Sequence, residues 1–220
     1  MHYTVITSGP LTDKALVNIK GTVICADGGA DFLARNNVVP DIVYGDMDSI
    51  SESGLAFLKD KGSKLRKFPV DKDYTDTELC LIDIPEGSDV TLICPLAGRI
   101  DHVLTNILVA SRYFEKFNSF FMSDGIADVY YISGSSVKFS ELYVDRFPAE
   151  PSKCAISAMI LDYEEGIKGF TAEGLYYEAD NLDVESGHSI TASNKLKDGA
   201  AAFRMKITSG RAVVTVTEAV

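Results

Sequence analysis

Two aspartates that close a short apolar run carry the strongest chemical signal in the sequence. Asp46 and Asp48 belong to a Gly-Asp-Met-Asp-Ser segment at positions 45–49, directly after the strand-like residues 42–44. Adjacent carboxylates repel each other unless a cation lies between them. Mg²⁺ prefers hard oxygen ligands of this kind, keeps several of its waters, and takes one or two carboxylates together with substrate phosphates. The segment therefore predicts a magnesium site that serves a phosphate-bearing substrate.

Two further polar segments follow along the chain. One is the acidic run Asp-Lys-Asp-Tyr-Thr-Asp at positions 71–76, and the other is Arg-Ile-Asp-His at positions 99–102. Each segment alone has an ordinary explanation, because Asp and Ser also bond to their own backbone in turns. Together they lie at the ends of consecutive predicted strands, where open α/β sheets bind their ligands. The combination favours a Mg²⁺–phosphate active site.

The first part of the chain alternates short apolar runs with helical segments. We expect strands at Tyr3–Thr7, Thr22–Ala26, Ile42–Tyr44, Lys64–Phe68, Val90–Cys94 and Ser119–Met122. We expect helices at Asp31–Asn36, Glu52–Lys61, Asp76–Ile84 and Asp101–Lys116. Strands rich in Val, Ile and Phe are typical of buried parallel sheets. The alternation predicts an α/β domain, Rossmann-like, with a mostly parallel sheet and helices on both of its faces.

The second part of the chain lacks amphipathic helices. Short segments are separated by Gly, Asn, Asp or Pro, and we expect strands at Tyr130–Ile132, Val137–Leu142, Ala155–Leu161, Gly174–Tyr177, Ser189–Ala192, Ala201–Ile207 and Ala212–Thr217. Turn signals at this spacing are typical of an antiparallel β-sandwich. We therefore expect two tightly packed domains, an α/β domain at 1–132 and a β-sandwich at 133–220.

Composition excludes several classes of partner. The chain has 220 residues and a formal net charge of −11, which argues against nucleic acid or an anionic membrane as the main partner. It contains neither a signal-peptide pattern nor an apolar run long enough for a transmembrane helix, so we expect a soluble, cytoplasmic protein. The four cysteines form no Cys-x-x-Cys pair, and a reducing compartment is consistent with them.

The segment Thr75-Asp76-Thr77-Glu78 has the form of a helix capping box. Such a box predicts that Thr75 accepts the backbone N–H of Glu78, while the Glu78 side chain reaches back to the N–H of Thr75. It holds Asp76 in the first helical turn, at the positive end of the helix dipole. Two interpretations stay open here: Asp76 stabilises the helix, or it presents a fixed carboxylate at the carboxyl edge of the sheet.

The segment at 98–106 combines a glycine, a cation and the first turns of a helix. Arg99 suits bidentate recognition of phosphate. His102 and Asn106 are four residues apart and share one helix face, as do Asp101 and Thr105. The helix is expected to pack against the core through Leu104, Ile107 and Leu108.

Asp27, Gly28 and Gly29 lie between a predicted strand and a predicted helix. Paired glycines there let backbone N–H groups approach a nucleotide phosphate, although Asp-Gly-Gly is also a common turn. The sequence contains neither Gly-x-Gly-x-x-Gly nor the Gly-x₄-Gly-Lys-Ser/Thr of a P-loop. Any use of ATP must therefore fall outside the P-loop class.

Four motifs in this order give the chain a resemblance to a known family. They are Ala-Asp-Gly-Gly-Ala at 26–30, Pro-Asp-Ile-Val-Tyr-Gly-Asp-Met-Asp-Ser-Ile at 40–50, Lys-Asp-Tyr-Thr-Asp-Thr-Glu-Leu at 72–79, and Gly-Arg-Ile-Asp-His-x₃-Asn at 98–106. The series resembles the thiamine pyrophosphokinases (thiamin diphosphokinases). Ser193-Asn194 also looks like a C-terminal element of that family, so the resemblance runs over essentially the whole chain.

The resemblance implies an activity, a fold and a set of roles. It implies Mg²⁺-dependent transfer of a pyrophosphoryl group from ATP to the hydroxyl of thiamine, with release of AMP. The fold would be an α/β domain followed by a β-sandwich, in a homodimer with the thiamine site near the subunit interface. The implied roles are metal ligands at Asp46, Asp48 and Asp76; catalytic residues that also include Arg99 and Asp101; nucleotide contacts at Asp27, Gly28, Gly29, Lys72, Asp73 and Thr75; and substrate contacts at His102, Asn106, Ser193 and Asn194.

Asp101 is the expected acceptor of the thiamine hydroxyl proton, because a carboxylate crowded by other carboxylates has its pKa raised. The chain departs from many relatives in having no Trp, and Tyr176 and Tyr177 are the candidate replacements near thiamine. Lys195 places a positive charge beside the Ser-Asn element.

Three other classes of protein remain as alternatives. A diphosphokinase that acts on another heterocyclic alcohol, such as a hydroxymethylpterin, would use the same metal and ATP chemistry. A non-catalytic nucleotide or thiamine sensor would be expected to lack the carboxylates, which are present here. A Mg²⁺ phosphohydrolase with a covalent aspartyl phosphate has no supporting motif.

Overall fold

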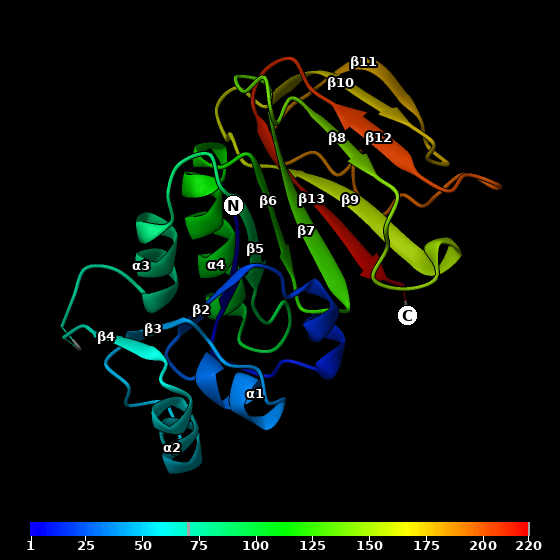
Figure 1. Cartoon of the computed structure of the whole chain (residues 1–220). Coiled ribbons are helices and arrows are strands. Elements are labelled where there is room, and N and C mark those ends of the chain that lie inside the picture. The colour runs from blue at the N-terminus through cyan, green and yellow to red at the C-terminus, as the bar shows by residue number, and fades with distance from the viewer. Residues whose placement is uncertain (70, 220) are drawn as a thin grey trace. The chain divides into compact units, whose positions relative to one another are not determined.

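The chain divides into two compact units, residues 1–125 and 126–220. The structure is a computed structural model that describes residues 1–69 and 71–219 (Figure 1). The domain boundary expected after residue 132 falls inside strand β7 (Ala127–Ser133), which belongs to the second unit. None of the helices in the described ranges combines the length and the apolarity that crossing a bilayer requires.

A parallel sheet forms the centre of the first unit. Its strands lie in the order β4-β3-β2-β1-β5-β6, and each neighbouring pair is parallel. Their bounds are β1 His2–Ile6, β2 Thr22–Ala26, β3 Ile42–Gly45, β4 Lys64–Lys67, β5 Asp89–Ile93 and β6 Ser119–Ser123. Strand order reverses at β1, which has β2 on one side and β5 on the other. In open α/β sheets the crevice at such a reversal is the usual ligand site.

Helices connect these strands, and all of them except the first, η1, lie where the sequence predicts a helix. They are the 3₁₀-helix η1 (Asp13–Asn18), α1 (Gly29–Arg35), α2 (Glu52–Lys61), α3 (Asp76–Asp83), α4 (Ile100–Tyr113) and the 3₁₀-helix η2 (Phe114–Lys116). Helix α1 packs beside α2, and α3 packs beside α4 (Figure 1). Local signals set the ends of α2: Ser51 accepts the N–H of Gly54 at its start, and Gly62 adopts a left-handed φ of 72° at its end. A residue without Cβ adopts that conformation readily.

The second unit consists of two antiparallel sheets. Strands β7, β13 (Arg211–Glu218) and β9 (Cys154–Ile160) lie side by side in that order. The other sheet has the order β11-β10-β12-β8, with β8 at Glu141–Val144, β10 at Ile167–Glu173, β11 at Ala179–Val184 and β12 at Phe203–Lys206. A short 3₁₀-helix, η3 (Pro151–Lys153), precedes β9. The predicted fold class, an α/β unit followed by an antiparallel β-sandwich, is confirmed.

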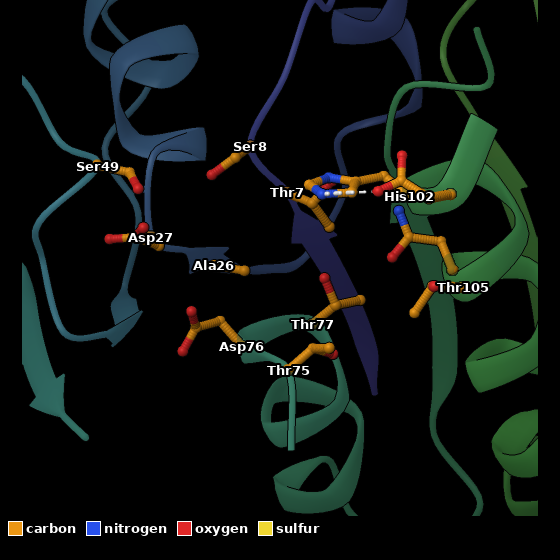
Figure 2. Close-up of a pocket in the computed structure, with 12 residues that line it drawn as sticks. Thr7, Ser8, Ala26, Asp27, Ser49, Thr75, Asp76, Thr77, His102 and Thr105 are labelled. Atoms are coloured by element: carbon orange, nitrogen blue, oxygen red, sulfur yellow. Dashed lines mark ion pairs between the residues drawn. The ribbon is translucent and has the colours of Figure 1, made fainter. Parts of the chain in front are cut away.

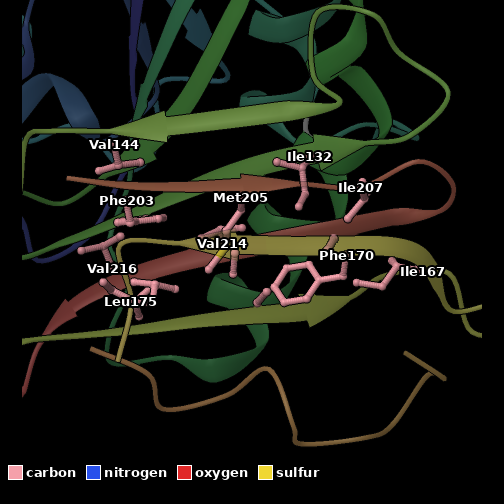
Figure 3. Close-up of a cluster of buried hydrophobic side chains, with 14 of the residues drawn as sticks. Ile132, Val144, Ile167, Phe170, Leu175, Phe203, Met205, Ile207, Val214 and Val216 are labelled. Carbon is pink, nitrogen blue, oxygen red and sulfur yellow. The ribbon is translucent and has the colours of Figure 1, made fainter. Parts of the chain in front are cut away.

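The core of the second unit lies between its two sheets. Alternate residues of the strands point inward, as the two-residue period of a strand requires. Phe170 and Met205 come from one sheet and Val214 and Val216 from the other, and all four are buried (Figure 3). Packing of this kind needs no helix, which explains why the amphipathic helical pattern disappears from the sequence after about residue 130.

The prediction of two strands in the second unit, Gly174–Tyr177 and Ser189–Ala192, is wrong. Residues Gly174–Tyr177 form the turn between β10 and β11, and Ser189–Ala192 lie in a loop. The sequence signal for β10 and β11 was weak because both contain residues that usually break strands. Gly169 and Asn181 have φ values of 61° and 51°, and the register between the two strands shifts near them.

The orientation expected for helix α4 is also wrong. Leu104 and Leu108 were expected to face the core, but their side chains are 52% and 60% exposed. Ile100 is 68% exposed and lies one turn before Leu104, so the three residues form an apolar stripe at a spacing of four. Ala110 is the fully buried residue of α4, and Ile107 is half-buried. The helix thus presents its apolar stripe to solvent.

Candidate active site

A cavity of about 470 Å³ opens at the carboxyl ends of the parallel strands. Thr7 and Ser8 follow β1, Ala26 is the last residue of β2, Asp27 follows it, and Ser49 lies after β3. The remaining lining comes from the first turns of two helices: Thr75, Asp76 and Thr77 at α3, and Asp101, His102, Thr105 and Asn106 at α4. Figure 2 shows Asp27 and Ser49 on one side of the cavity and His102 and Thr105 on the other. The cavity thus lies at the strand ends, beside β1, where the strand order reverses.

Three carboxylates meet at one edge of this cavity. Asp27, Asp46 and Asp48 each offer an oxygen, and these oxygens all lie within 4.8 Å of one another. Asp27 is buried, Asp46 is half-buried and Asp48 is exposed. The backbone N–H of Asp48 donates to Asp46 Oδ1 at 3.1 Å, and Ser49 Oγ donates to Asp48 Oδ1 at 3.0 Å. The sequence pointed to Asp46 and Asp48 as a pair, and the fold adds Asp27 from the neighbouring strand.

Asp27 and Asp46 have shifted pKa values. Burial raises the pKa of Asp27; the charges of Asp46, Asp76 and Asp48 add to the effect, and a hydrogen bond with Ser49 opposes it. The pKa of Asp46 is lowered, chiefly by the backbone N–H of Asp48, and the charge of Lys72 contributes. The pKa values of Asp27 and Asp46 are therefore shifted in opposite directions, which is common where carboxylates share one site.

Glycines at the strand ends let the chain segments approach closely. A Cβ on Gly45 would lie 3.0 Å from the Cβ of Asp27, and Gly45 has a φ of 139° that side chains disfavour. A Cβ on Gly29 would lie 2.8 Å from the carbonyl oxygen of Ile6, and one on Gly28 would lie 2.8 Å from Ser8 Oγ. The three glycines therefore permit close packing around Asp27. None of them lines the cavity directly.

Asp76 lies at the start of α3, on the floor of the cavity (Figure 2). Lys72 Nζ is 3.1 Å from Asp76 Oδ1, and both side chains are largely buried. Thr75 caps the helix by accepting the N–H of Glu78 at 3.1 Å. Asp73 lies in the exposed loop before the helix and outside the cavity lining. The structure thus brings Asp76, Thr75 and Lys72 to the site and leaves Asp73 at its periphery.

The second half of the predicted capping box is wrong. The Glu78 carboxylate does not reach back to Thr75 but accepts a hydrogen bond from Tyr113 Oη at 2.8 Å. Arg112 lies 3.7 Å from the same oxygen. Glu78 is buried, and a buried carboxylate requires strong partners, which α4 supplies. The interaction joins α3 to α4, the two helices whose first turns line the cavity.

Arg99 and Asp101 form a bidentate pair at the start of α4. Arg99 donates from Nε to Asp101 Oδ1 at 3.2 Å and from a terminal nitrogen to Oδ2 at 2.5 Å. Hydrogen bonding to Arg99 lowers the pKa of Asp101, and the pKa of Arg99 rises in return. The expectation that crowding raises the pKa of Asp101 is therefore wrong for the protein alone. Its nearest partner is a cation, because the carboxylate cluster lies across the cavity.

His102, Thr105 and Asn106 form the opposite wall, as their shared helix faces predict. His102 Nε2 is 4.0 Å from Asp101 Oδ2. Thr7, Ser8 and Thr77 also line the cavity, but they were not predicted from the sequence as site residues. The first two follow the apolar run of β1, so the rule that places ligands at strand ends could have identified them. Thr77 lies between the residues of the capping box, and its side chain is buried.

Ser193 and Asn194 lie in the second unit, on the loop between β11 and β12. They border a hollow of about 470 Å³ that Tyr176, Tyr177 and Lys195 also line. Asn194 Nδ2 donates to the carbonyl of Tyr177 at 2.7 Å, and its Oδ1 accepts the N–H of Tyr177 at 3.1 Å. The Asn194 amide therefore holds the loop in place. Lys195 Nζ lies 4.8 Å from the centre of the Tyr176 ring, so its charge lies over the aromatic ring that was expected to replace Trp.

Comparison with known proteins settles the family. The profile described as "Thiamin pyrophosphokinase, catalytic domain" matches residues 14–122, which contain most of the cavity lining. The chain belongs to the thiamine pyrophosphokinase family. The resemblance carried by the four motifs is thus confirmed.

Individual members of the thiamine pyrophosphokinase family extend this result. Thiamine pyrophosphokinase 1 of Arabidopsis thaliana is 34% identical over 113 residues, 41% of this chain and 42% of that protein. The chain thus spans under half the length of the Arabidopsis relatives it matches. Thiamine pyrophosphokinase 1 of Oryza sativa subsp. japonica is 26% identical over 198 residues, 80% of this chain and 72% of that protein.

The fold has a close counterpart among solved structures of the family. Thiamine pyrophosphokinase from Bacillus subtilis superposes with a TM-score of 0.82 at 19% identity, and the match covers 100% of both chains. At that level of identity the comparison establishes the fold, and it includes both the α/β unit and the β-sandwich.

Proposed function

We propose that this protein is a Mg²⁺-dependent thiamine pyrophosphokinase that transfers a pyrophosphoryl group from ATP to the hydroxyl of thiamine and releases AMP. The observation that carries the proposal is the cavity at the strand ends. Carboxylates of Asp27, Asp46 and Asp48 meet at one edge of it, and Asp101, His102 and Asn106 form the opposite wall. Family membership supports the same conclusion.

The donor set fits Mg²⁺. The cluster offers only hard carboxylate oxygens, and the separation of up to 4.8 Å between them is compatible with a shared octahedral ion and bound waters. We assign Asp46 and Asp48 as ligands, with Asp76 completing the site from α3. When bound, Mg²⁺ would neutralise phosphate charge and orient the polyphosphate for in-line attack. Lys72, which pairs with Asp76, would face the same phosphates.

Arg99 and Asp101 are assigned linked roles. Arg99 suits bidentate binding of phosphate, but in the protein alone it is engaged with Asp101. Binding of ATP would draw Arg99 onto the polyphosphate, because a doubly charged phosphate is a stronger partner than one carboxylate. Asp101 would then be free to accept the proton of the thiamine hydroxyl. His102 and Asn106, on the same wall, would position that hydroxyl.

The second unit is proposed to contribute to thiamine binding, and the protein is proposed to be a homodimer. Ser193, together with Tyr177, borders a hollow with an aromatic rim, which suits a heterocycle. The apolar stripe Ile100-Leu104-Leu108 on α4 supports self-association, because exposed apolar stripes usually mark interfaces and the helix carries active-site residues on its first turns. Contact between two copies at this stripe would place the two active sites near the interface.

The test is formation of AMP and thiamine diphosphate from ATP and thiamine in the presence of Mg²⁺. Equal amounts of the two products are expected from the wild-type protein. Asp46→Ala and Asp48→Ala are each expected to lower turnover on the order of a hundredfold or more. Asp60→Ala is the matched control, because Asp60 is an exposed carboxylate on α2 that pairs only with Lys61 among the described residues.

Each other outcome has a defined meaning. AMP formation with a hydroxymethylpterin but not with thiamine would keep the metal and ATP chemistry and change the substrate. Binding of ATP without turnover of either alcohol would indicate a sensor. Release of inorganic phosphate without thiamine diphosphate would indicate a phosphohydrolase. Full activity in Asp46→Ala and Asp48→Ala would refute the assignment of the carboxylates.

A further inference from the structure

Asp31 of helix α1 is bonded to the loop that carries two of the site carboxylates. Its carboxylate accepts the backbone N–H of Ser51, at 3.0 Å to Oδ2 and 3.3 Å to Oδ1, and Oδ1 also accepts the Ser51 hydroxyl at 2.6 Å. Ser51 follows the segment of Asp46 and Asp48 in the chain and caps α2 by accepting the N–H of Gly54. Asp31 therefore fixes the end of the loop 46–51, at the point where α2 begins.

Two glycines let α1 and this loop approach each other. A Cβ on Gly54 would overlap Asp31 Oδ1, so a side chain at position 54 would exclude the Asp31 carboxylate. A Cβ on Gly28, the residue before α1, would lie 3.0 Å from the carbonyl oxygen of Ser49. The start of α1 thus contacts the loop at two places, and α1 also packs beside α2 (Figure 1).

The loop 46–51 has a conformation that its own backbone disfavours. Met47 has a φ of 72°, a left-handed value that a residue with a long side chain rarely adopts. The side chains of Met47 and Ile50 are buried in the core of the first unit, while Asp46 and Asp48 bring carboxylate oxygens within 4.8 Å of each other. A strained turn persists only where its surroundings hold it. The bonds from Asp31 are one of the constraints that hold this turn.

We propose that Asp31 is a positioning residue of the active site, because its bonds to Ser51 hold the loop that presents Asp46 and Asp48 to the cavity. These bonds form a clamp between α1 and the start of α2. Asp31 does not line the cavity itself, so it acts through the loop. The inference rests on the proposed function for the reaction that the two aspartates serve, whereas the clamp is a property of the ligand-free fold.

Asp31→Ala removes the clamp and leaves every carboxylate of the cavity in the chain. We expect kcat for AMP formation to fall about tenfold or more, because a displacement of about 1 Å near the reacting groups can cost a hundredfold. KM for thiamine is expected to stay unchanged, because the proposed thiamine contacts lie on α4 and in the second unit. Asp31→Asn keeps one acceptor oxygen for the Ser51 hydroxyl and is expected to recover most of the lost kcat.

Gly62→Ala separates positioning from a loss of stability. Gly62 ends α2 with a φ of 72°, and a Cβ there would meet no atom within 4 Å. Alanine therefore strains the far end of the helix without a clash. Asp31→Ala and Gly62→Ala are both expected to lower the unfolding temperature measured by circular dichroism. A fall in kcat is expected in Asp31→Ala alone, because Gly62 lies at the opposite end of α2 from the loop.

Amide hydrogen exchange followed by NMR tests the clamp without substrate or metal. The N–H of Ser51 donates to Asp31, and the N–H of Asp48 donates to Asp46 Oδ1 at 3.1 Å. Exchange at both amides is expected to be faster in Asp31→Ala than in the wild type and unchanged in Gly62→Ala. The amide of Asp48 is the decisive one, because its partner is retained in the variant and its exchange rises only if the loop itself moves.

Several results would overturn the inference. Unchanged kcat in Asp31→Ala, with a wild type that forms AMP, would show that the loop keeps its place without the clamp. Equal losses of kcat in Asp31→Asn and Asp31→Ala would assign the effect to the charge of Asp31, and an equal loss in Gly62→Ala would assign it to the stability of α2. A wild type that forms no AMP would refute the proposed function instead. Exchange at Asp48 would then decide the clamp alone, and an unchanged rate would refute it.

Discussion

The hydroxyl of Tyr44 joins three elements of the first unit and allows a quantitative prediction. Tyr44 is a residue of β3 with a 2% exposed side chain. Its Oη donates to Asp83 Oδ2 on α3 at 2.8 Å and accepts from Arg66 of β4 at 3.0 Å. The ring also stacks on Phe68 with a centroid distance of 5.9 Å. Tyr44→Phe keeps the ring and removes only the hydroxyl.

The cost of this substitution near neutral pH follows from the partners of the hydroxyl. Hydrogen bonds to charged groups contribute about 1.5–3 kcal/mol. Arg66 and Asp83 are 53% and 39% exposed and pair with each other, so water can replace part of what the hydroxyl supplied. We therefore expect Tyr44→Phe to lower the free energy of unfolding by about 1.5 kcal/mol, the lower end of that range.

The cost should shrink at alkaline pH. Burial, followed by the hydrogen bond to Asp83 and its charge, raises the pKa of Tyr44 far above its ordinary value. A tyrosine in the unfolded chain loses its proton near pH 10. Above that pH only the unfolded chain releases the proton, which favours unfolding of the wild type. At pH 11 this lowers the free energy of unfolding of the wild type by about 1.4 kcal/mol. Phenylalanine has no such proton, so the difference between the two proteins should nearly vanish at pH 11.

Urea unfolding of both proteins at pH 8 and pH 11, followed by circular dichroism, measures this difference. Comparing wild type with variant at each pH cancels the other groups that titrate in both. Tyr163→Phe is the control, because Tyr163 is 86% exposed and its loss should change stability at neither pH. A difference of the same size at pH 8 and pH 11 would refute the reasoning, since it would mean that Tyr44 titrates alike in the folded and unfolded chains.

Three further predictions address assembly, chemistry and packing. Leu104→Glu, on the exposed stripe of α4, is expected to halve the mass measured by light scattering. Val17→Glu is the control, because Val17 is 69% exposed, and it should leave the mass unchanged. A dimer that persists in Leu104→Glu would place the interface elsewhere. Asp101→Asn is expected to lower kcat about a hundredfold or more if this residue accepts the proton, and near-full turnover in the AMP assay would remove that role. Gly29→Ala is expected to lower the free energy of unfolding by about 1–3 kcal/mol in urea titrations, because its Cβ would lie 2.8 Å from the Ile6 carbonyl oxygen; an unchanged value would mean that β1 and α1 separate freely.

Local patterns determined the elements and the class of chemistry. Apolar runs and turn residues predicted the strands and helices of the α/β unit, because buried parallel strands and helix caps have strong local signals. The pair Asp46 and Asp48 predicted a cation site, and the strand-end segments that contain Asp76 and Asp101 were predicted to contribute to the same site. The four ordered motifs were sufficient to predict the family, because each combines residue types and spacings that rarely occur together by chance.

Several features depended on the tertiary structure. Strands β10 and β11 were missed because Gly169 and Asn181 adopt left-handed conformations that only pairing with neighbours stabilises. The exposure of Leu104 and Leu108 could not be inferred from their spacing, because a helical pattern shows that a face is apolar but not what covers it.

The partners of individual charges were likewise decided by the fold. Asp27 joins Asp46 and Asp48 because β2 and β3 are neighbours in the sheet, and Glu78 turns from its own helix cap to Tyr113 of α4. Arg99 holds Asp101 and lowers its pKa, where the sequence predicted a rise. A sequence specifies which charged groups exist and roughly where each element ends, but the strength of an electrostatic interaction depends on distance and burial, which only the folded chain sets.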